Sequence, residues 1–245
     1  MTATPDVAPL RPAAGAAPHR SRLRRIASHP LAHLAAALLL IALVQSFVAK
    51  VYQVPSASME QTLMPGDRIL VDRLGIAGAP ERGDIVVFER PDAWRDAPRS
   101  EPSPWRAAAG WVGDLFGLGP SNGDALVKRV VGAPGDEIAC CDDGGHVTVD
   151  GVALDESYVT NDLPFDADTI DCDSIPRSPR CFDPVRLGPG EFLLLGDNRA
   201  DSSDSISLCR GDVPTTPACA RPVDRENIVG RVFLRLWPLD RVGAP

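Results

Sequence analysis

A single apolar run near the N-terminus does most to limit what this chain can fold into. Residues 31–49 contain no Asp, Glu, Lys or Arg. Nineteen residues in a helix reach about 28 Å, close to the thickness of a bilayer's hydrocarbon core. The run therefore predicts one transmembrane anchor helix. Residues 1–30, rich in Ala, Pro and Arg, are expected to form a disordered cytoplasmic tail.

The charges around the run predict its orientation. Arg20, Arg22, Arg24 and Arg25 precede it, and most acidic residues follow it. This asymmetry places the N-terminus in the cytoplasm and the remaining chain outside the membrane. The alternative is a cleaved signal peptide, because the strictly apolar part, residues 34–44, has only 11 residues. Phe47 gives a poor small-x-small cleavage site at Ala49, so a retained single-pass anchor is favoured.

The chain after the anchor predicts a mainly β fold. It is rich in Pro and Gly, which favour short strands and turns. Short β-branched or apolar runs between turn residues occur at 68–72, 84–88, 126–131, 146–150, 191–195 and 228–237. We expect a catalytic β core built from residues 51–138 and 186–240, with a small Cys-containing β module, residues 139–185, inserted between its halves.

A Pro-rich segment, residues 89–123, interrupts the strand pattern. It carries three Trp residues, and residues 105–118 are compatible with a short amphipathic helix. Interfacial Trp side chains suit headgroup depth in a membrane. A loop helix packed on the core is the alternative, and the sequence leaves the two open.

Charge and cysteine content exclude other classes. The net charge of −8 argues against nucleic acid as the main partner. All six Cys lie beyond residue 139, and their even number indicates disulfides in an oxidising compartment. We predict the local pairs Cys172–Cys181 and Cys209–Cys219, which leaves Cys140 and Cys141 without an assigned partner. No C-x-x-C pair is present, so neither zinc, the rival interpretation, nor any other metal or cofactor is expected.

Two residues carry the predicted chemistry. Ser58 lies in Pro55-Ser-Ala-Ser-Met-Glu60, shortly after the anchor, and a serine hydroxyl needs a base to become a nucleophile. Lys128 is one of only two lysines, and it lies within a predicted strand. Burial disfavours an ammonium and lowers the pKa of lysine, so a neutral amine could accept the Ser58 proton. Ser202, in the turn-rich segment 196–205, could hydrogen-bond that amine and orient it.

Four ordered motifs and a closing one together resemble bacterial type I signal peptidases. They are Ser56-x-Ser58-Met59, Gly83-Asp-Ile-Val-Val-Phe88, Lys128-Arg-Val-Val-Gly-x-Pro-Gly-Asp136, Gly196-Asp-Asn-Arg199-x-x-Ser202-x-Asp204-Ser205 and Asn227-Ile-Val-Gly-Arg231. The resemblance extends from about residue 42 to 238. It implies a membrane-bound serine endopeptidase that removes signal peptides from secretory preproteins after small residues (Ala-x-Ala). The implied partners are those signal peptides, the lipid bilayer and, as a further candidate, the secretion translocon.

The resemblance also implies a role for each matching residue. Ser58 is the nucleophile and Lys128 the general base of a Ser/Lys dyad. The Ser58 backbone N–H and the Ser56 hydroxyl form the oxyanion hole, and Ser202 positions Lys128. As structural support, Arg129 and Asp197 are expected to pair. Small pockets lined in part by Val54 and Val127 are expected to select Ala-like side chains.

Two departures weaken one of these expectations. The family usually has Asp where this chain has Ala200, and often has Arg where it has Ile206. The resemblance therefore no longer supports a salt bridge of Asp204, the third supporting residue, or the rigidity of its loop. Residues 207–222 resemble an insertion, and a Cys209–Cys219 disulfide is our hypothesis for what replaces that pair.

Three rival functions were weighed. A self-cleaving repressor also uses a Ser–Lys pair, but predicts a DNA-binding N-terminus in place of the apolar run. A membrane-tethered binding module without activity would leave Lys128 exposed. A sortase-like transpeptidase needs Cys with His, and His146 is the only histidine after the anchor.

Overall fold

The computed structural model describes residues 29–76, 78–95, 103–116, 124–210 and 219–245. Residues 1–28 of the predicted tail, and residues 96–102 and 117–123 of the predicted 89–123 segment, lie outside the described residues. The chain divides into two compact units, Met1–Leu40 and Ile41–Pro245, which are described separately below.

The first unit contributes most of helix α2, Pro30–Leu43. Proline suits the first helical position, where its missing N–H removes no helical hydrogen bond. The π-helix η1, Val44–Val48, continues α2, and Ala49 ends it in an extended conformation. The helical span Pro30–Val48 has a mean hydropathy of 2.2, so it is long and apolar enough to cross a membrane.

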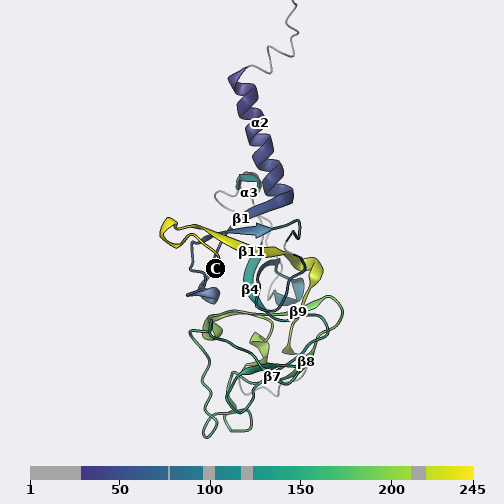
Figure 1. Cartoon of the computed structure of the whole chain (residues 1–245), viewed down its shortest axis with the longest axis vertical. Coiled ribbons are helices and arrows are strands. Elements are labelled where there is room, and N and C mark those ends of the chain that lie inside the picture. The colour runs from purple at the N-terminus through teal and green to yellow at the C-terminus, as the bar shows by residue number, and fades with distance from the viewer. Residues whose placement is uncertain (1–28, 77, 96–102, 117–123, 211–218) are drawn as a thin grey trace, which may run out of the picture. The chain divides into compact units, whose positions relative to one another are not determined.

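The second unit contains two antiparallel sheets, so the predicted mainly β fold is confirmed (Figure 1). The larger sheet has the order β1-β2-β11-β3-β4-β9-β10. Its strands are β1 Ala49–Gln53, β2 Arg68–Asp72, β3 Ile85–Glu89, β4 Ala125–Gly132, β9 Glu191–Leu195, β10 Val223–Asp224 and β11 Ile228–Trp237.

The smaller sheet is built from the chain between two neighbours of the larger one. Its order is β7-β6-β5-β8, with β5 Glu137–Cys140, β6 Val147–Val149, β7 Val152–Ala153 and β8 Phe182–Arg186. β4 and β9 pair directly, although this whole sheet lies between them in the sequence. In Figure 1 the labels β7 and β8 lie at the end of the unit opposite to β1.

Three apolar clusters form the core. One packs under β1, β2 and β3 and includes Met59 and Leu63, which are fully buried. A second lies around Val86, Phe88 and Leu194. The third joins the two sheets, since it contains residues of β4 and β9 together with residues of β5, β6 and β8. Burial of such side chains is the main force that holds the elements together.

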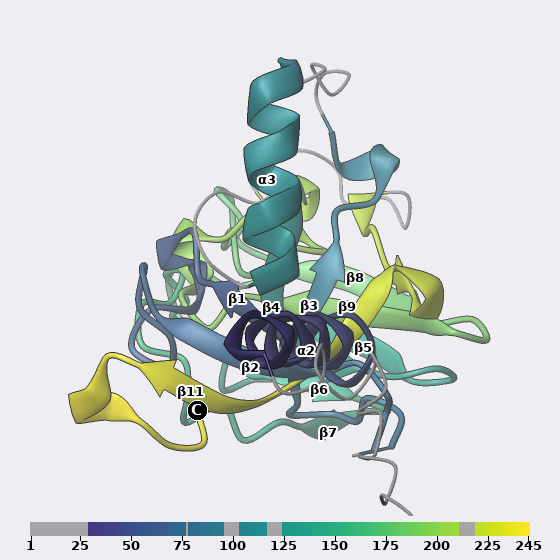
Figure 2. The ribbon, with the colours of Figure 1, turned by 90° about the horizontal axis from the view of Figure 1, so that it is seen from above.

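One helix stands apart from this core. Helix α3, Pro104–Phe116, falls near the predicted helix 105–118, and in Figure 2 it projects beyond the strands of the larger sheet. Trp105 and Trp111 are 72% and 64% exposed. A contact of these indole rings with the membrane surface remains a prediction.

The cysteines form three disulfides. Cys172–Cys181 and Cys209–Cys219 pair as predicted, and the unassigned neighbours Cys140 and Cys141 are bonded to each other. Sulfur atoms of Cys141, Cys172 and Cys181 lie within 4.8 Å of one another, but each is already in a disulfide and is therefore no thiolate ligand.

Candidate active site

Ser58 lies in a tight turn between β1 and β2. The 3-10 helix η2, Ala57–Met59, follows Val54, whose amide donates to the carbonyl of Asp67. Met59 is fully buried, and its carbonyl accepts from the amide of Leu63. The apolar residue next to Ser58 thus ties the turn to the core while the serine oxygen remains free for chemistry.

The two serines of this turn lie close together. Ser58 is 6% exposed, whereas Ser56 is exposed to solvent. Their hydroxyl oxygens are 3.3 Å apart, and either can donate to the other. The Ser56 hydroxyl is therefore close enough to donate to the carbonyl oxygen of a group that Ser58 Oγ would attack.

Lys128 is carried by the central strand β4, between β3 and β9. Val86 is its register partner on β3, and the lysine is 2% exposed. Its Nζ donates to Ser58 Oγ over 2.5 Å and to the Val127 carbonyl over 3.2 Å. Strand β4 therefore delivers an amine, enclosed by protein, to the hydroxyl of the turn.

The environment of Lys128 favours its neutral form. Burial, which disfavours the ammonium, lowers the pKa of Lys128 from 10.5 to about 8. The carboxylates of Asp204 and Asp197 act in the opposite direction, and the guanidinium groups of Arg90 and Arg210 add to the lowering. Desolvation is the largest of these effects, so the enclosure of Lys128 within the fold is the main cause of its lowered pKa.

The loop after β9 holds the Ser58 turn from the other side. Asn198 donates from its amide to the Ser58 carbonyl and from Nδ2 to the Ala57 carbonyl, both over 3.1 Å. A Cβ at Gly196 would lie 2.5 Å from the Ser58 carbonyl oxygen and would overlap Ser202 Oγ. Only glycine allows this close approach of the two chain segments.

Ser202 differs from its expected arrangement. It is 7% exposed, but its hydroxyl has no hydrogen-bond partner among the described residues. The expected bond to Lys128 is not formed, since the amine donates to Ser58 and to Val127 instead. A buried hydroxyl without a hydrogen-bond partner costs about 1–3 kcal/mol of stability. A hydrogen bond to any donor that reaches Ser202 would therefore be favourable.

Arg129, the residue after Lys128, forms an ion pair with Asp197, whose charge acts on the lysine. Asp197 is fully buried, and it accepts from Arg129 Nε and Nη2 over 2.8 and 2.7 Å and from Thr62 Oγ1 over 2.6 Å. Arg129 also donates to the Gly83 carbonyl and stacks on the ring of Tyr158, 4.1 Å from its centroid. Adjacent residues on β4 point to opposite faces, so Arg129 anchors the strand on the side away from the base.

Asp204 does form an ion pair, although position 206 does not supply the cation. Ile206 is 3% exposed and packs in the core, as an apolar side chain should. Asp204, which is fully buried, pairs instead with Arg210, whose Nη2 lies 2.9 and 3.1 Å from the two carboxylate oxygens. The cation comes from six residues along the chain, and no local sequence pattern marks Arg210 as the partner of Asp204.

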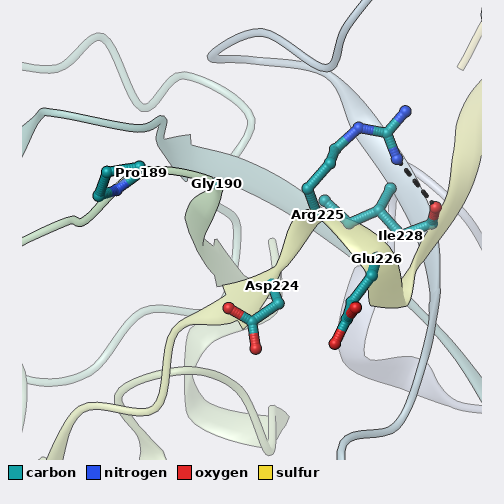
Figure 3. A pocket seen from close by; sticks show the side chains of 6 residues that line it. All are labelled: Pro189, Gly190, Asp224, Arg225, Glu226 and Ile228. Carbon is teal, nitrogen blue, oxygen red and sulfur yellow. Dashed lines mark hydrogen bonds between the residues drawn. The ribbon is translucent and has the colours of Figure 1, made fainter.

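Val54 and Val127 share one apolar cluster next to the turn. They are 2% and 5% exposed, and the cluster also contains Met59 and Leu63. A separate surface hollow at the β9–β10 end, drawn in Figure 3, shares no residue with the Ser58–Lys128 site. It is lined by Pro189, Gly190, Asp224, Arg225, Glu226 and Ile228.

Comparison with known proteins settles the family. A model of the family described as "Signal peptidase, peptidase S26" matches residues 28–237. The chain belongs to the signal peptidase family, peptidase S26. The implied enzyme class, a serine signal peptidase, is thereby confirmed.

Individual relatives agree with this assignment. Signal peptidase I of Mycobacterium tuberculosis (strain H37Rv) is 36% identical over 243 residues, which cover 92% of this chain and 76% of that protein. "Probable signal peptidase I-2" of Synechocystis sp. is 32% identical over 201 residues, covering 82% and 68%. Among solved structures, a signal peptidase I from Enterococcus faecalis V583 has 23% identity and a TM-score of 0.33, over 62% of this chain and 95% of that one.

Several contacts of the peptidase's segment between β4 and β9 could not be predicted from the sequence. Asn161 Nδ2 donates to Asn198 Oδ1 over 2.8 Å, and the Asn161 carbonyl accepts from the Ala200 amide. Arg199 is 3% exposed and pairs over 2.6 Å with Glu156 of the same module. These partners lie 37 and 43 positions apart, and no local pattern marks them.

Proposed function

We propose that this peptidase removes N-terminal signal peptides from secretory preproteins, with Ser58 as the nucleophile and Lys128 as the general base. The observation that carries the proposal is the 2.5 Å contact between Lys128 Nζ and Ser58 Oγ, enclosed within the fold. A base within this distance of a hydroxyl can take its proton as the hydroxyl attacks.

The first half of the reaction forms an acyl-enzyme. Ser58 Oγ bonds to the carbonyl carbon of the scissile peptide while its proton passes to the neutral Lys128 Nζ. The carbonyl oxygen becomes an oxyanion, which the Ser58 backbone N–H and the Ser56 hydroxyl stabilise. The C–N bond then breaks, and the Lys128 ammonium returns the proton to the leaving amine.

The second half releases the signal peptide. A water molecule gives a proton to Lys128 and bonds to the acyl carbon, and the ester bond to Ser58 breaks. The proton returns to Ser58 Oγ, which restores both groups. In both halves the Ser202 hydroxyl, which is buried and unpaired among the described residues, would accept from the Lys128 amine and orient it, while Arg129, Asp197 and Asp204 hold the surrounding chain in place.

Specificity for small residues would arise next to the nucleophile. Val54 precedes the Ser58 turn, and Val127 precedes the base on β4. Their branched side chains leave room for Ala-like side chains on the acyl side of the cut. A precursor with Leu in place of the last Ala of its Ala-x-Ala sequence should therefore be cleaved far more slowly.

The location of the chemistry follows from the helical span. Pro30–Val48 would anchor the chain in the bilayer, with the Arg-rich N-terminus in the cytoplasm and the catalytic unit outside. Protease added to intact spheroplasts should then digest the catalytic unit. Protection of the catalytic unit until the membrane is permeabilised would contradict this orientation.

The dyad is tested with the full-length protein in detergent and a precursor whose signal ends in Ala-x-Ala. Ser58→Ala and Lys128→Ala should each abolish cleavage at the mature junction. Lys128→Arg should also fail, since guanidinium stays charged at any working pH. Lys50→Gln, which alters the only other lysine, is the matched control and should cleave normally. Cleavage by either alanine variant would overturn the assignment.

A further inference from the structure

Asp204 is a buried charge whose stability depends on its partners. Its carboxylate is fully buried, and it accepts from the amides of Gly196 and Ile206 over 3.3 Å each. The cation that balances it is Arg210, in contact with both carboxylate oxygens. Removing one member of such a pair leaves an uncompensated charge in the interior, which is strongly unfavourable.

Arg210 holds a second group at the same time. Its Nη1 donates to the backbone carbonyl of Ser202 over 2.6 Å. The planar guanidinium therefore joins the Asp204 carboxylate to the backbone of Ser202. The Ser202 hydroxyl in turn lies beside Gly196, where the loop approaches the Ser58 carbonyl. A fork of this kind fixes direction as well as distance, which a lysine ammonium does not.

The neighbouring disulfide fixes where Arg210 lies. Cys209, bonded to Cys219, precedes it and is 2% exposed in the cluster that contains Leu195 and Ile206. On the far side of the bond, the Arg221 amide donates to the Ser205 carbonyl over 2.7 Å. Both described ends of this disulfide loop are thus tied to the segment that carries Ser202 and Asp204.

We infer that Arg210, held in place by the Cys209–Cys219 disulfide, is a positioning residue that sets the placement of Ser202 and the charge balance around Lys128. The inference rests on the proposed function, because it concerns the base of that reaction. Arg210 supplies, from four residues later in the chain, the cation that the sequence pattern lacks at Ile206.

The charges facing Lys128 make the effect measurable. They come from Asp204 and Asp197 in the loop after β9, from Arg90 after β3, and from Arg210 itself. Of these, the Asp204 carboxylate does most to raise the pKa of Lys128, and Arg210 lowers that pKa. Loss of Arg210 removes a cation and leaves its carboxylate partner unbalanced, so the base should hold its proton to higher pH.

The test is the pH profile of kcat/KM for Arg210→Met in the full-length protein. The acid limb should move upward by about one pH unit, the size of effect expected from a nearby unbalanced charge. KM at the pH optimum should stay unchanged, because the side-chain contacts of Arg210 go to Ser202 and Asp204 and it acts through them. Arg210→Lys keeps the charge, so its acid limb should lie at the same pH as that of the unmodified protein. Its kcat should still be reduced, because an ammonium does not hold the Ser202 backbone as the planar guanidinium does.

The disulfide is tested by the double variant Cys209→Ser/Cys219→Ser. Its acid limb should move in the same direction, and adding it to Arg210→Met should give no further shift, since both act through one group. Cys172→Ser/Cys181→Ser, which removes the module's disulfide, is the control and should leave the limb in place.

Each outcome decides the inference. An acid limb that stays in place in folded Arg210→Met overturns it, and so does an equal shift in the Cys172–Cys181 control. If Arg210→Met does not fold, the Cys209→Ser/Cys219→Ser variant decides in its place, because an acid limb that stays put in that folded variant also overturns the inference. Failure of the unmodified protein to cleave any precursor would refute the proposed function instead.

Discussion

The side-chain nitrogen of Lys128 lies 2.5 Å from the hydroxyl oxygen of Ser58, with the two residues 2% and 6% exposed. They are 70 positions apart in the sequence. The contact exists because β4, which carries the base, occupies the middle of the larger sheet, while the turn after β1 folds back over it. Two consequences concern the base, and two concern the chain segments that hold it.

Activity should follow the titration of Lys128. The amine must be neutral to accept the Ser58 proton, and the neutral fraction grows as pH rises through the pKa of about 8. We expect kcat/KM to increase with pH and to be half-maximal near that value. The measurement is the initial rate of precursor cleavage, at constant ionic strength, from neutral to alkaline pH. A profile that declines over this range would contradict a lysine base.

Replacing the buried lysine should stabilise the fold near neutral pH. Between pH 8 and 10.5 the unfolded chain binds a proton that folded Lys128 does not, so the free energy of unfolding rises with pH there. Below pH 8 the full cost is present, about 3 kcal/mol at about 1.4 kcal/mol per pKa unit. Lys128→Met in a Ser58→Ala background should therefore be more stable than Ser58→Ala alone.

Urea unfolding at several pH values checks this expectation. The advantage of the Met variant should be largest below pH 8 and should shrink toward 10.5, because the penalty then disappears from the lysine protein. An advantage that does not change with pH would mean that packing, and not the buried charge, explains the difference.

Gly196→Ala should impair catalysis more than folding. The added methyl group would lie 2.5 Å from the Ser58 carbonyl and would overlap Ser202 Oγ, so the turn must shift. A displacement near 1 Å costs about 100-fold in rate, whereas overpacking costs about 1–3 kcal/mol of stability. Single-turnover cleavage and thermal unfolding measure the two effects.

Gly188→Ala is the matched control for that variant. A methyl group there would meet the carboxylate of Glu191 at 3.1 Å, the end of a side chain that can move. Its cleavage rate should stay close to that of the unmodified protein. Equal losses in the two variants would show that Gly196 has no special relation to the site.

The inserted module should support catalysis through Asn161. Its Nδ2 donates to Asn198 Oδ1, which leaves Asn198 Nδ2 directed at the Ala57 carbonyl. Asn161→Ala removes one hydrogen bond of about 1 kcal/mol and frees the Asn198 amide to turn. We expect kcat to fall about tenfold, the rate equivalent of roughly 1.4 kcal/mol, with KM unchanged. Thr160→Ala, at an exposed neighbouring position, should have no effect.

The local chemistry of the chain was enough to predict its elements. The apolar run at 31–49 predicted the helical span, and β-branched or apolar runs predicted β2, β9 and β11 at their observed positions. Hydrophobic length and alternation are properties of neighbouring residues, so they can be read without knowing the fold. Spacing also predicted two of the three disulfides, because each closes a short loop.

The short strands and long-range polar partners needed the tertiary structure. β1 was not predicted as a strand: Ala49 was assigned to the anchor and residues 51–53 to the β core, and Ala49–Gln53 forms a strand by pairing with β2. The contacts of Asn161 with Asn198 and of Glu156 with Arg199 depend on how the two sheets pack against each other. No sequence pattern encodes such distances.

The sequence by itself determined the kinds of chemistry available: one apolar span, a serine after it, and a lysine within a strand. It could also match these residues to a family. Only the tertiary structure decided which charges meet, as Arg210 with Asp204 illustrates against the expectation from Ile206. A buried carboxylate needs a cation, but any segment that reaches it can supply one, and reach is a property of the folded chain.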